Sequence, residues 1–452
     1  MRMRWTLLAA GLALLAVIGG YLWQRHRPGP QAPRQASPAM LSLPAAGIRR
    51  IDLDSARGLL RLEKRDGQWT VAGGPPVRLA QVSVDNLLYV FSRLEAEELI
   101  AEQAADLSAY GLASPSVRAT AFLADGTTAG LLLGDPTPAR SAYYAQVQGQ
   151  RDVYTVARNI GEYLNYTLDD LRPRRLPPIR GSEITYLLAR RGAIVLEFRE
   201  KTTGEQARGL VTYGNYMITR PYHFPQGVSS ERFPGLVVKI DDLRIDGFVS
   251  DAPQDLARYG LDRPWGELLV KDHASVLHLL FGSGPDREHV YFKQASEPNV
   301  YAIEAWRIAF LKELRPFDYI DKFIFLPELP SVDRIVLEGA AARHVLEVVR
   351  REGEEPRHLA DGVQRKPEAF KSFYQNLVGL YVEGEVERQP SGSPEWRVRF
   401  ILNSGPRTDV TIRYLPYDRK FLAVEVDGTA EFAISREQVD RLLSRLEDLL
   451  KY

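Results

Sequence analysis

Histidine, carboxylate and tyrosine side chains are the residues of this sequence whose chemistry could serve catalysis or binding. The chain of 452 residues contains no cysteine, which excludes thiol catalysis, disulfide bonds and cysteine-bound metal ions. Of its seven histidines, His273 and His278 are the closest pair, and five residues apart in a strand they point to opposite faces of a sheet. They are therefore poor joint ligands for a metal ion. From these side chains we predict no catalytic, cofactor-binding or metal-binding residue.

The sequence motifs of common enzyme classes are also missing. The chain has no Gly-x-x-x-x-Gly-Lys-Ser/Thr, Gly-x-Ser-x-Gly or His-Glu-x-x-His segment, which argues against P-loop nucleotidases, common serine hydrolases and zinc proteases. Gly282-Ser-Gly284 comes nearest to a dinucleotide-binding loop, but Arg287 occupies its third glycine position, and a hairpin turn is the better interpretation. The many acidic residues leave a carboxylate-dependent hydrolase open, because sequence does not show how far apart two carboxylates lie.

Two clusters of side chains have a binding interpretation and a structural one. Tyr143, Tyr144, Tyr213, Tyr216 and Tyr222 could stack on sugar rings, although aromatic residues in strands more often pack within a sheet. The arginines at positions 172, 174, 175 and 180 could touch anionic lipid. They lie in a proline-rich stretch, for which a solvated linker is the better interpretation.

Composition and charge are those of a folded protein with no general attraction for nucleic acid. Apolar residues make up 45% of the chain and charged residues 26%, as in average globular proteins. The totals of 58 basic and 58 acidic residues hide an asymmetry, because residues 1–50 hold seven arginines and no acid. The remainder is mildly acidic, which is not typical of nucleic-acid binders. At about 150 residues per domain, the length predicts roughly three domains.

An uncharged segment near the N-terminus predicts a membrane anchor over residues 1–23. Residues 5–23 carry no charge, and as a helix they would span about 28 Å, against a hydrocarbon core of about 30 Å. Trp5, Tyr21 and Trp23 lie at the two ends of this segment, where aromatic side chains favour the membrane interface. A cleaved signal peptide is the alternative, but such peptides have shorter apolar cores and a small-residue cleavage site.

Residues 24–47, rich in proline, alanine and glutamine, predict an extended tether between the anchor and the body. Both flanks of the apolar segment are basic, so the positive-inside rule does not decide the orientation. A body without cysteine tolerates an oxidising compartment. We expect a single-pass protein of the cytoplasmic membrane with its body on the outer side.

Internal repeats give the clearest information about the body. Asp106-Leu-Ser-Ala-Tyr-Gly-Leu112 recurs 149 residues later as Asp255-Leu-Ala-Arg-Tyr-Gly-Leu261. The segments Leu131–Gly134 and Val153–Val156 recur in the same order as Leu279–Gly282 and Val300–Ile303. A third, fainter copy of the last segment is Glu431–Ile434, but this part of the chain lacks the Asp-Leu-x-x-Tyr-Gly-Leu motif. We predict repeat units at 48–178, 179–330 and, in divergent form, 331–452.

The repeated motif has a structural interpretation. Asp106 and Asp255 suit the N-cap of a short helix, and Gly111 and Gly260 suit the left-handed position that ends it. In such a motif Leu112 packs on Leu107 and Leu261 on Leu256, while Tyr110 and Tyr259 fill core. These ten residues are therefore predicted as structural.

Within a unit, alternating apolar residues and Asp-Gly turns predict β-hairpins, and helical spacing predicts helices, for example over 84–98. In the third unit, Ser435 and Gln438 have the spacing of a helix capping box. The predicted fold class is α+β: one transmembrane helix, then three units of antiparallel hairpins with helices packed on one face.

With these motifs in this order, the chain resembles a bacterial family known as domain of unknown function 4340. The resemblance covers most of residues 48–326, and it implies a membrane-anchored protein whose gene often neighbours those of gliding-motility-like ABC transporters. It carries no known active site, so it implies no catalytic residue and no cofactor. Partners implied in this way are permease or ATPase subunits of such a transporter.

Together these observations favour a non-enzymatic envelope protein that attaches to the membrane through residues 5–23. Its three units would form an extracytoplasmic scaffold or binding arm accessory to an ABC-type transporter. Two alternatives stay open: an envelope glycan- or lipid-binding module that uses the tyrosine-rich strands, and an unrecognised carboxylate-dependent hydrolase. No nucleic-acid partner is expected, and the sequence does not indicate an oligomeric state.

Overall fold

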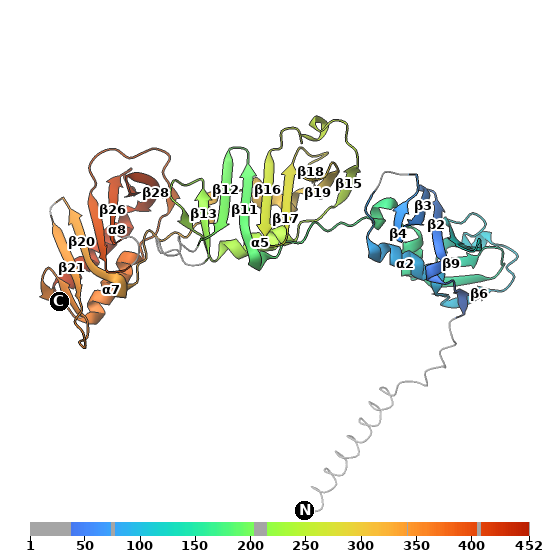
Figure 1. Cartoon of the computed structure of the whole chain (residues 1–452), viewed down its shortest axis with the longest axis horizontal. Coiled ribbons are helices and arrows are strands. Elements are labelled where there is room, and N and C mark those ends of the chain that lie inside the picture. Colours follow the sequence, from blue (N-terminus) through green and yellow to red (C-terminus); the bar gives the residue numbers. More distant parts are fainter. Residues whose placement is uncertain (1–37, 74–76, 203–214, 341, 405–407, 452) are drawn as a thin grey trace, which may run out of the picture. The chain divides into compact units, whose positions relative to one another are not determined.

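The computed structural model describes residues 38–73, 77–202, 215–340, 342–404 and 408–451, which form two compact units, one up to Pro173 and one from Arg174 onwards (Figure 1). The predicted anchor at 1–23 and the first part of the predicted tether lie outside these ranges. Within the described ranges, no helix has the length and apolar character needed to cross a membrane.

The first unit is built on an eight-stranded antiparallel sheet, here called sheet I. In hydrogen-bonding order its strands are β4 (Gln68–Val71), β3 (Gly58–Arg65), β2 (Ile48–Ser55), β7 (Val117–Leu123), β8 (Thr128–Pro136), β9 (Ala142–Val147), β10 (Val153–Ala157) and β6 (Glu98–Ala101). The other elements are β1 (Ala39–Leu41), η1 (Ala45–Gly47), α2 (Gln81–Ser92), β5 (Leu94–Glu95), η2 (Ser108–Tyr110), α3 (Arg158–Leu164) and η3 (Leu168–Leu171). Strands β1 and β5 pair as a small separate sheet.

The second unit begins with a nine-stranded antiparallel sheet, sheet II. Its order is β14 (Gln226–Gly227), β13 (Tyr216–Arg220), β12 (Ile194–Glu200), β11 (Ile184–Arg191), β16 (Gly266–Asp272), β17 (Val276–Phe281), β18 (His289–Gln294), β19 (Val300–Glu304) and β15 (Gly247–Ser250). The helices around it are η4 (Gly181–Glu183), α5 (Arg232–Asp241), η5 (Ala257–Tyr259), η6 (Ala305–Ile308), α6 (Ala309–Lys312) and η7 (Pro316–Asp318).

The same unit continues into a second nine-stranded antiparallel sheet, sheet III. Its order is β23 (Val363–Gln364), β22 (Arg357–Ala360), β21 (Arg343–Val349), β20 (Val332–Gly339), β25 (Trp396–Leu402), β26 (Asp409–Pro416), β27 (Phe421–Val426), β28 (Thr429–Ser435) and β24 (Gly384–Glu385). The helices are η8 (Leu329–Ser331), α7 (Pro367–Val378) and α8 (Arg436–Lys451).

The three large sheets share one topology. Counted from β10, β19 or β28, seven strands follow one another in the same order in each sheet. On its other side, this first strand pairs with an edge strand from earlier in the chain, which is β6, β15 or β24. Sheet III follows this order although its part of the chain lacks the Asp-Leu-x-x-Tyr-Gly-Leu motif. The motif is therefore not required for the sheet topology.

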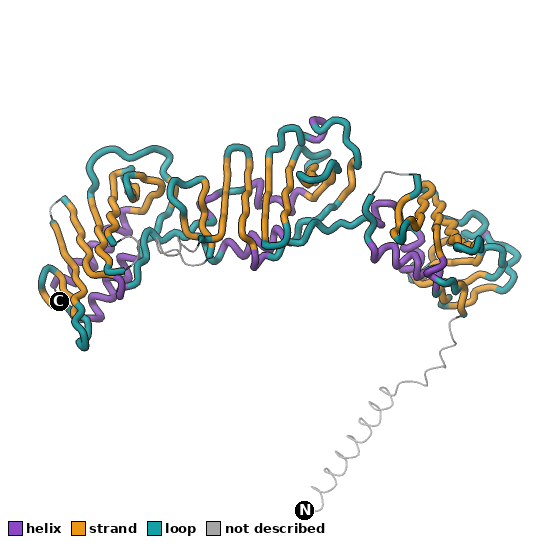
Figure 2. The backbone as a smooth tube through the Cα atoms, viewed as in Figure 1, coloured by secondary structure: helices purple, strands orange, loops and turns teal. Residues whose placement is uncertain are grey.

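The predicted fold class, an α+β chain of hairpins with helices packed on one face behind a transmembrane helix, is wrong. The structure consists mostly of β-sheet, with 41% strand and 22% helix in four antiparallel sheets (Figure 2). The predicted hairpins do not stand apart, because ladders such as β2–β7 and β10–β6 join them into one continuous sheet. The helix expected over 84–98 ends at Ser92, since Leu94 and Glu95 pair with β1. Neither the pairing between hairpins nor the pairing of β5 with β1 produces a local periodicity in the sequence from which it could be predicted.

In each repeat, a short segment that comes before the sheet, here called the lead-in segment, pairs with the chain just after the helix α2, α5 or α7. In the first unit this is the β1–β5 pair, which places a strand at residues 39–41, inside the predicted tether. In the second unit, Arg175 bridges to Arg244 ahead of sheet II, and Phe323 bridges to Tyr381 ahead of sheet III.

Each of the two units has its own main apolar core. The main core of the first unit takes side chains from its sheet and from α2 and α3, among them Ile51, Phe91 and Ile160. In the second unit one continuous core extends from Leu176 to Leu449 and includes both sheets. The repeats that carry sheets II and III are thus packed together.

Candidate functional site

The first copy of the repeated motif folds as a short 3-10 helix held at both ends by its own residues. The Asp106 carboxylate accepts hydrogen bonds from the Ser108 hydroxyl (2.6 Å) and backbone N–H (2.8 Å), and these two bonds lower the pKa of Asp106. Gly111 ends the helix with a left-handed φ of 69°. The Leu112 N–H then donates to the Leu107 carbonyl at 3.0 Å.

The second copy repeats this geometry. Asp255 accepts a hydrogen bond from the Ala257 N–H at 2.8 Å, and Gly260 ends the helix at a φ of 66°. The Leu261 N–H donates to the Leu256 carbonyl at 3.0 Å. Leu112 and Leu261 are both buried.

Each motif packs against the other repeated segments of its own sheet. The ring of Tyr110 lies edge-on to that of Tyr144, and the ring of Tyr259 lies edge-on to that of Tyr291, with 5.1 Å between centroids in both pairs. A Cβ atom on Gly134, the last residue of the Leu-Leu-Leu-Gly segment, would lie 2.1 Å from the Tyr110 carbonyl oxygen. The glycine at the end of that segment is thus explained by close approach of the motif backbone.

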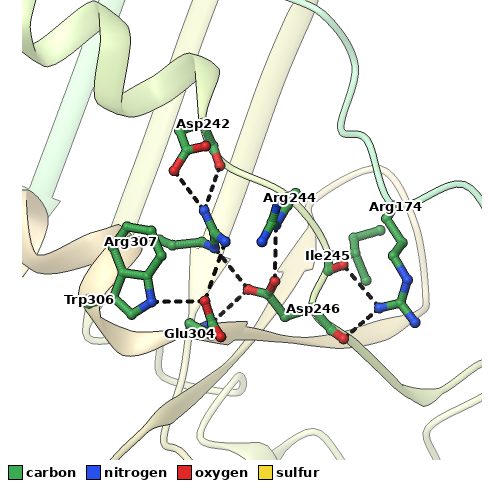
Figure 3. A network of polar contacts seen from close by, with 8 residues as sticks. All are labelled: Arg174, Asp242, Arg244, Ile245, Asp246, Glu304, Trp306 and Arg307. Carbon is green, nitrogen blue, oxygen red and sulfur yellow. Dashed lines mark hydrogen bonds and ion pairs between the residues drawn. The ribbon is translucent and has the colours of Figure 1, made fainter. Parts of the chain in front are cut away.

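In sheet II, an ion-pair network centres on the buried Arg307, whose side chain is only 4% exposed (Figure 3). Its guanidinium contacts Asp242 at 2.6 Å, Asp246 at 3.2 Å and Glu304 at 3.3 Å, and it lies over the ring of Trp306. Asp242 follows α5 and Asp246 precedes β15, so Arg307 ties the helix-to-edge-strand connection to the end of β19. All of these partners of Arg307 come from the same repeat, which favours a structural role for the network.

A different residue occupies the equivalent position in each sheet, three residues after β10, β19 or β28. In sheet III it is Gln438, which is buried and exchanges hydrogen bonds with both backbone groups of Tyr381. Gln438 also donates to Glu383, as does the Ser435 hydroxyl. The two residues predicted as a capping box therefore bond to the 381–383 connection. In sheet I the position is Ile160, part of the apolar core.

A small recess lies between the repeats of sheets II and III, and we call it the junction recess. Its buried floor is made by Ile320, Val382, Val424 and Phe432. The cavity volume is about 60 Å³. It is lined from the β13–β14 side of sheet II, from the lead-in segment 320–324 and from β27 and β28 of sheet III, so neither repeat forms it alone.

The two repeats are held together beside the recess by Tyr222 in the loop between β13 and β14. Its ring packs on Phe432 at 5.1 Å between centroids, and its hydroxyl donates to Glu385 at 2.9 Å. Burial and the nearby Glu385 carboxylate raise the pKa of Tyr222, so the phenol keeps its proton. In the same loop, the His223 N–H donates to Glu431 at 2.5 Å.

The charges in the junction recess have one sign. The described residues that line it include the carboxylates of Asp321, Asp427 and Glu431 and no lysine, arginine or histidine. A neighbouring open hollow of about 760 Å³ shares Ile320, Asp321 and Phe323 with the recess. Its lining carries Arg232 and Lys322 as well as acids, so its charge is mixed.

The histidines singled out in the sequence do not converge. His273 is exposed, whereas the His278 imidazole contacts Glu267 at 2.8 Å. Burial opposes ionisation of Glu267, but hydrogen bonds from His278 and Arg190 together lower the pKa of this carboxyl group. In the described part of the chain, no group of three or more histidine, aspartate or glutamate side chains is placed to hold a metal ion.

Most of the tyrosines singled out in the sequence take part in packing. Tyr144 contacts Tyr110, Tyr216 lies on Phe233, and Tyr222 is buried at the junction. Tyr213 lies outside the described residues.

Three of the four clustered arginines have side-chain partners within the chain, and the fourth, Arg175, pairs through its backbone. The Arg174 guanidinium donates to the Asp246 carbonyl at 2.5 Å, and Arg175 forms the lead-in bridge. Arg180 pairs with Glu183, and the buried Arg172 lies 3.9 Å from the Asp169 carboxylate. These contacts favour a structural role for the cluster over a lipid-binding one.

No pattern in the sequence indicated the junction recess, since its residues come from four separate segments. The excess of acids in them becomes visible only once these segments are brought together.

One family model matches the chain twice, over residues 69–252 and 217–395, and its description is Domain of unknown function (DUF4340). No curated protein and no solved structure matches the chain. The two matches begin 148 residues apart, which is the spacing of the sequence repeat. Each begins in the strand β4 or its counterpart β13 and continues into the following repeat.

Proposed function

The chain belongs to the DUF4340 family, and we propose that it works as a non-enzymatic scaffold or binding arm of the bacterial cell envelope, accessory to an ABC-type transporter. In this proposal residues 5–23 attach the chain to the cytoplasmic membrane, and the sheets lie on the outer side. The protein acts through contacts with other proteins.

The observation that carries the proposal is where the repeated residues make their contacts. Asp106, Gly111 and Leu112 bond and pack within their own sheet, and the second copy does the same. What the chain repeats is therefore a stable sheet. Repeated sheets multiply surface on which partners can bind, as in other repeat proteins.

A second observation supports a binding role for the second unit. The junction recess is a small apolar hollow with carboxylates at its border, formed where two repeats meet. Small, well-packed hollows of this kind accept the anchoring side chains of protein partners. The membrane attachment is supported by the uncharged stretch 5–23 and its aromatic ends.

The test is gentle detergent extraction of tagged full-length protein from its native host, followed by mass spectrometry of what co-purifies. We expect a permease and an ATPase in fixed proportion to the chain, and retention of the chain in the membrane after alkaline extraction. A tagged single-pass membrane protein of unrelated sequence serves as the control. A folded chain that purifies without transporter subunits contradicts the accessory role.

A further inference from the structure

We propose that the junction recess binds one basic side chain, an arginine or a lysine, presented by a protein partner. Its carbon stem would lie on the apolar floor, and its charged end would meet Asp321, Asp427 and Glu431. The inference rests on the proposed function, because it supplies a contact site for a binding arm.

The size of the recess selects a single side chain as its occupant. Pockets for cofactors and drug-sized ligands measure roughly 300–1,000 Å³. The junction recess has a volume of about 60 Å³, which is too small for such a molecule. One side chain inserted from a neighbouring surface is the occupant that fits.

The chemistry of the lining selects a basic side chain. Arginine and lysine bury their methylene stems against apolar surface while their charge stays at the border. The floor of Ile320, Val382 and Val424 suits the stem, and a border with three carboxylates and no cation among its described residues suits the charge. The nearby Lys322 ammonium lies over the ring of Phe317, at 4.3 Å from its centroid.

Backbone N–H groups hold two of the three carboxylates in position without exhausting their capacity for hydrogen bonds. Asp321 accepts from the Phe323 N–H at 3.3 Å, and Glu431 accepts from the His223 N–H at 2.5 Å. An ionised carboxylate has about four acceptor positions, so each can also accept from a guanidinium or ammonium group. Preorganised acceptors reduce the entropy lost on binding.

One exposed aromatic ring lines the recess, and a second exposed ring belongs to the residue paired with it through the backbone. Phe323 is 48% exposed and lines it, and Tyr381, which pairs with Phe323 through the β-bridge, is 45% exposed. A cation that enters along these rings gains cation–π attraction, to which the planar guanidinium of arginine adds stacking. The aromatic rim therefore favours the same occupant as the acidic border.

The experiment is selection of a displayed library of random 12-residue peptides on the purified full-length chain in detergent. We expect the enriched peptides to share an arginine or lysine flanked by apolar residues. Replacing that basic residue by glutamine in the best peptide should weaken binding at least tenfold. The double variant Asp321→Asn/Asp427→Asn should lose a similar factor, while Asp440→Asn, which removes an exposed acid on α8, should bind as the wild type does.

Both substitutions suit their positions, so the double variant should fold. The asparagine of Asp321→Asn would keep an acceptor for the Phe323 N–H, and Asp427 has a φ of 52°, a conformation that asparagine tolerates well. Circular dichroism checks this, and each single variant provides a second measurement. Enriched peptides without a basic residue, no enrichment at all, or equal binding by the wild type and the double variant would overturn the proposal.

The outcomes also separate this inference from the proposed function. Selection of basic peptides that need Asp321 and Asp427, without transporter subunits in the detergent extract, leaves the recess as a binding site and removes the transporter role. Transporter subunits that co-purify equally with the wild type and the double variant, without basic peptides, leave the role and remove this site.

Discussion

Sheets II and III solve one structural problem with different chemistry. In both, the chain leaves a helix, passes an acidic residue and enters the edge strand, and the backbone N–H of that residue donates to the neighbouring strand: Asp246 to Ala302 at 2.9 Å, and Glu383 to Ala433 at 2.8 Å. The connection is then tied down by Arg307 in sheet II and by Gln438 in sheet III.

Sheet I has the same backbone bond, from Glu97 to Thr155 at 2.8 Å, but the tying position is the buried apolar Ile160. One backbone topology thus accepts a charged, an amide or an apolar side chain at this position. The comparison shows that backbone hydrogen bonds define the sheet. The type of side chain three residues after β10, β19 or β28 varies with its neighbours in each sheet.

The largest expected effect comes from removing the charged tie. Arg307→Ala leaves Asp246, which is 15% exposed, without its buried cation, and we expect a loss of about 3 kcal/mol in the free energy of unfolding of the second unit. Gln438→Ala removes only neutral donors and acceptors and should cost about 1–2 kcal/mol. Urea unfolding followed by circular dichroism measures both. Equal losses would show that the two ties are energetically the same and would end the comparison.

The next effect concerns the Asp-Leu-x-x-Tyr-Gly-Leu motif, which is the same in sheets I and II, whereas the residue three positions after β10 or β19 differs between them. Gly111→Ala and Gly260→Ala should each cost at least about 2 kcal/mol, because a left-handed φ disfavours alanine and the new Cβ meets packed atoms. At Gly111 it would lie 2.7 Å from the Asp135 backbone nitrogen, and at Gly260 2.7 Å from that of Ser283.

Gly149→Ala is the matched control for these two variants. Gly149 has a φ of +86°, but a Cβ there would have open space around it. It should therefore show only the conformational cost of about 1 kcal/mol. If thermal unfolding gives the same loss for all three variants, close packing of the motif contributes nothing.

A smaller effect is expected at the contact that joins the repeats of sheets II and III. Tyr222→Phe keeps the ring on Phe432 and removes the hydrogen bond to Glu385, which should cost about 1 kcal/mol. The measurement is urea unfolding of the full chain. Tyr216→Phe, in the same sheet and packed on Phe233, is the control and should change little. A loss in the control as large as in Tyr222→Phe would contradict the assignment.

The last effect is a loss of stability at acidic pH that comes from a buried histidine of sheet III and is absent at neutral pH. Burial, with help from Lys371 and Arg350, lowers the pKa of His358 below its ordinary value of 6.5. The unfolded chain therefore binds the proton more readily, and this histidine makes stability fall as pH drops below about 6.5. His358→Leu should flatten that part of the pH profile of thermal unfolding, whereas the exposed His273→Leu should leave it unchanged. A profile that keeps its slope in His358→Leu would assign the acid sensitivity elsewhere.

Sequence reasoning predicted local features well and tertiary ones poorly. Gly111 and Gly260 were readable as left-handed positions, because a glycine after a short apolar helix and before a proline has few other uses. The helix itself is shorter than expected, and Asp106 lies one residue ahead of its N-cap. The fold class was wrong because strand pairs such as β10 with β6 join residues about 55 positions apart, and no periodicity signals them.

The junction recess could not be predicted at all. Asp321, Val382 and Glu431 are ordinary residues in their own segments, and their approach depends on the packing of Tyr222 against a strand of the following repeat. A signal existed only in retrospect, in the aromatic Tyr222-His-Phe224 insertion between β13 and β14, where sheet III has the two-residue turn Asp361-Gly362.

By itself the sequence determined the number of repeats, the spacing near 148 residues and the local geometry of the glycine-ended motif, because these depend on residue identity and on backbone conformations a few residues long. Only the tertiary structure decided that hairpins merge into continuous sheets, which side chain ties each edge strand, and that two repeats enclose an acidic recess. Those features depend on hydrogen bonds and packing between segments far apart in the chain. The energy of such a contact depends on both segments, so neither segment alone predicts it.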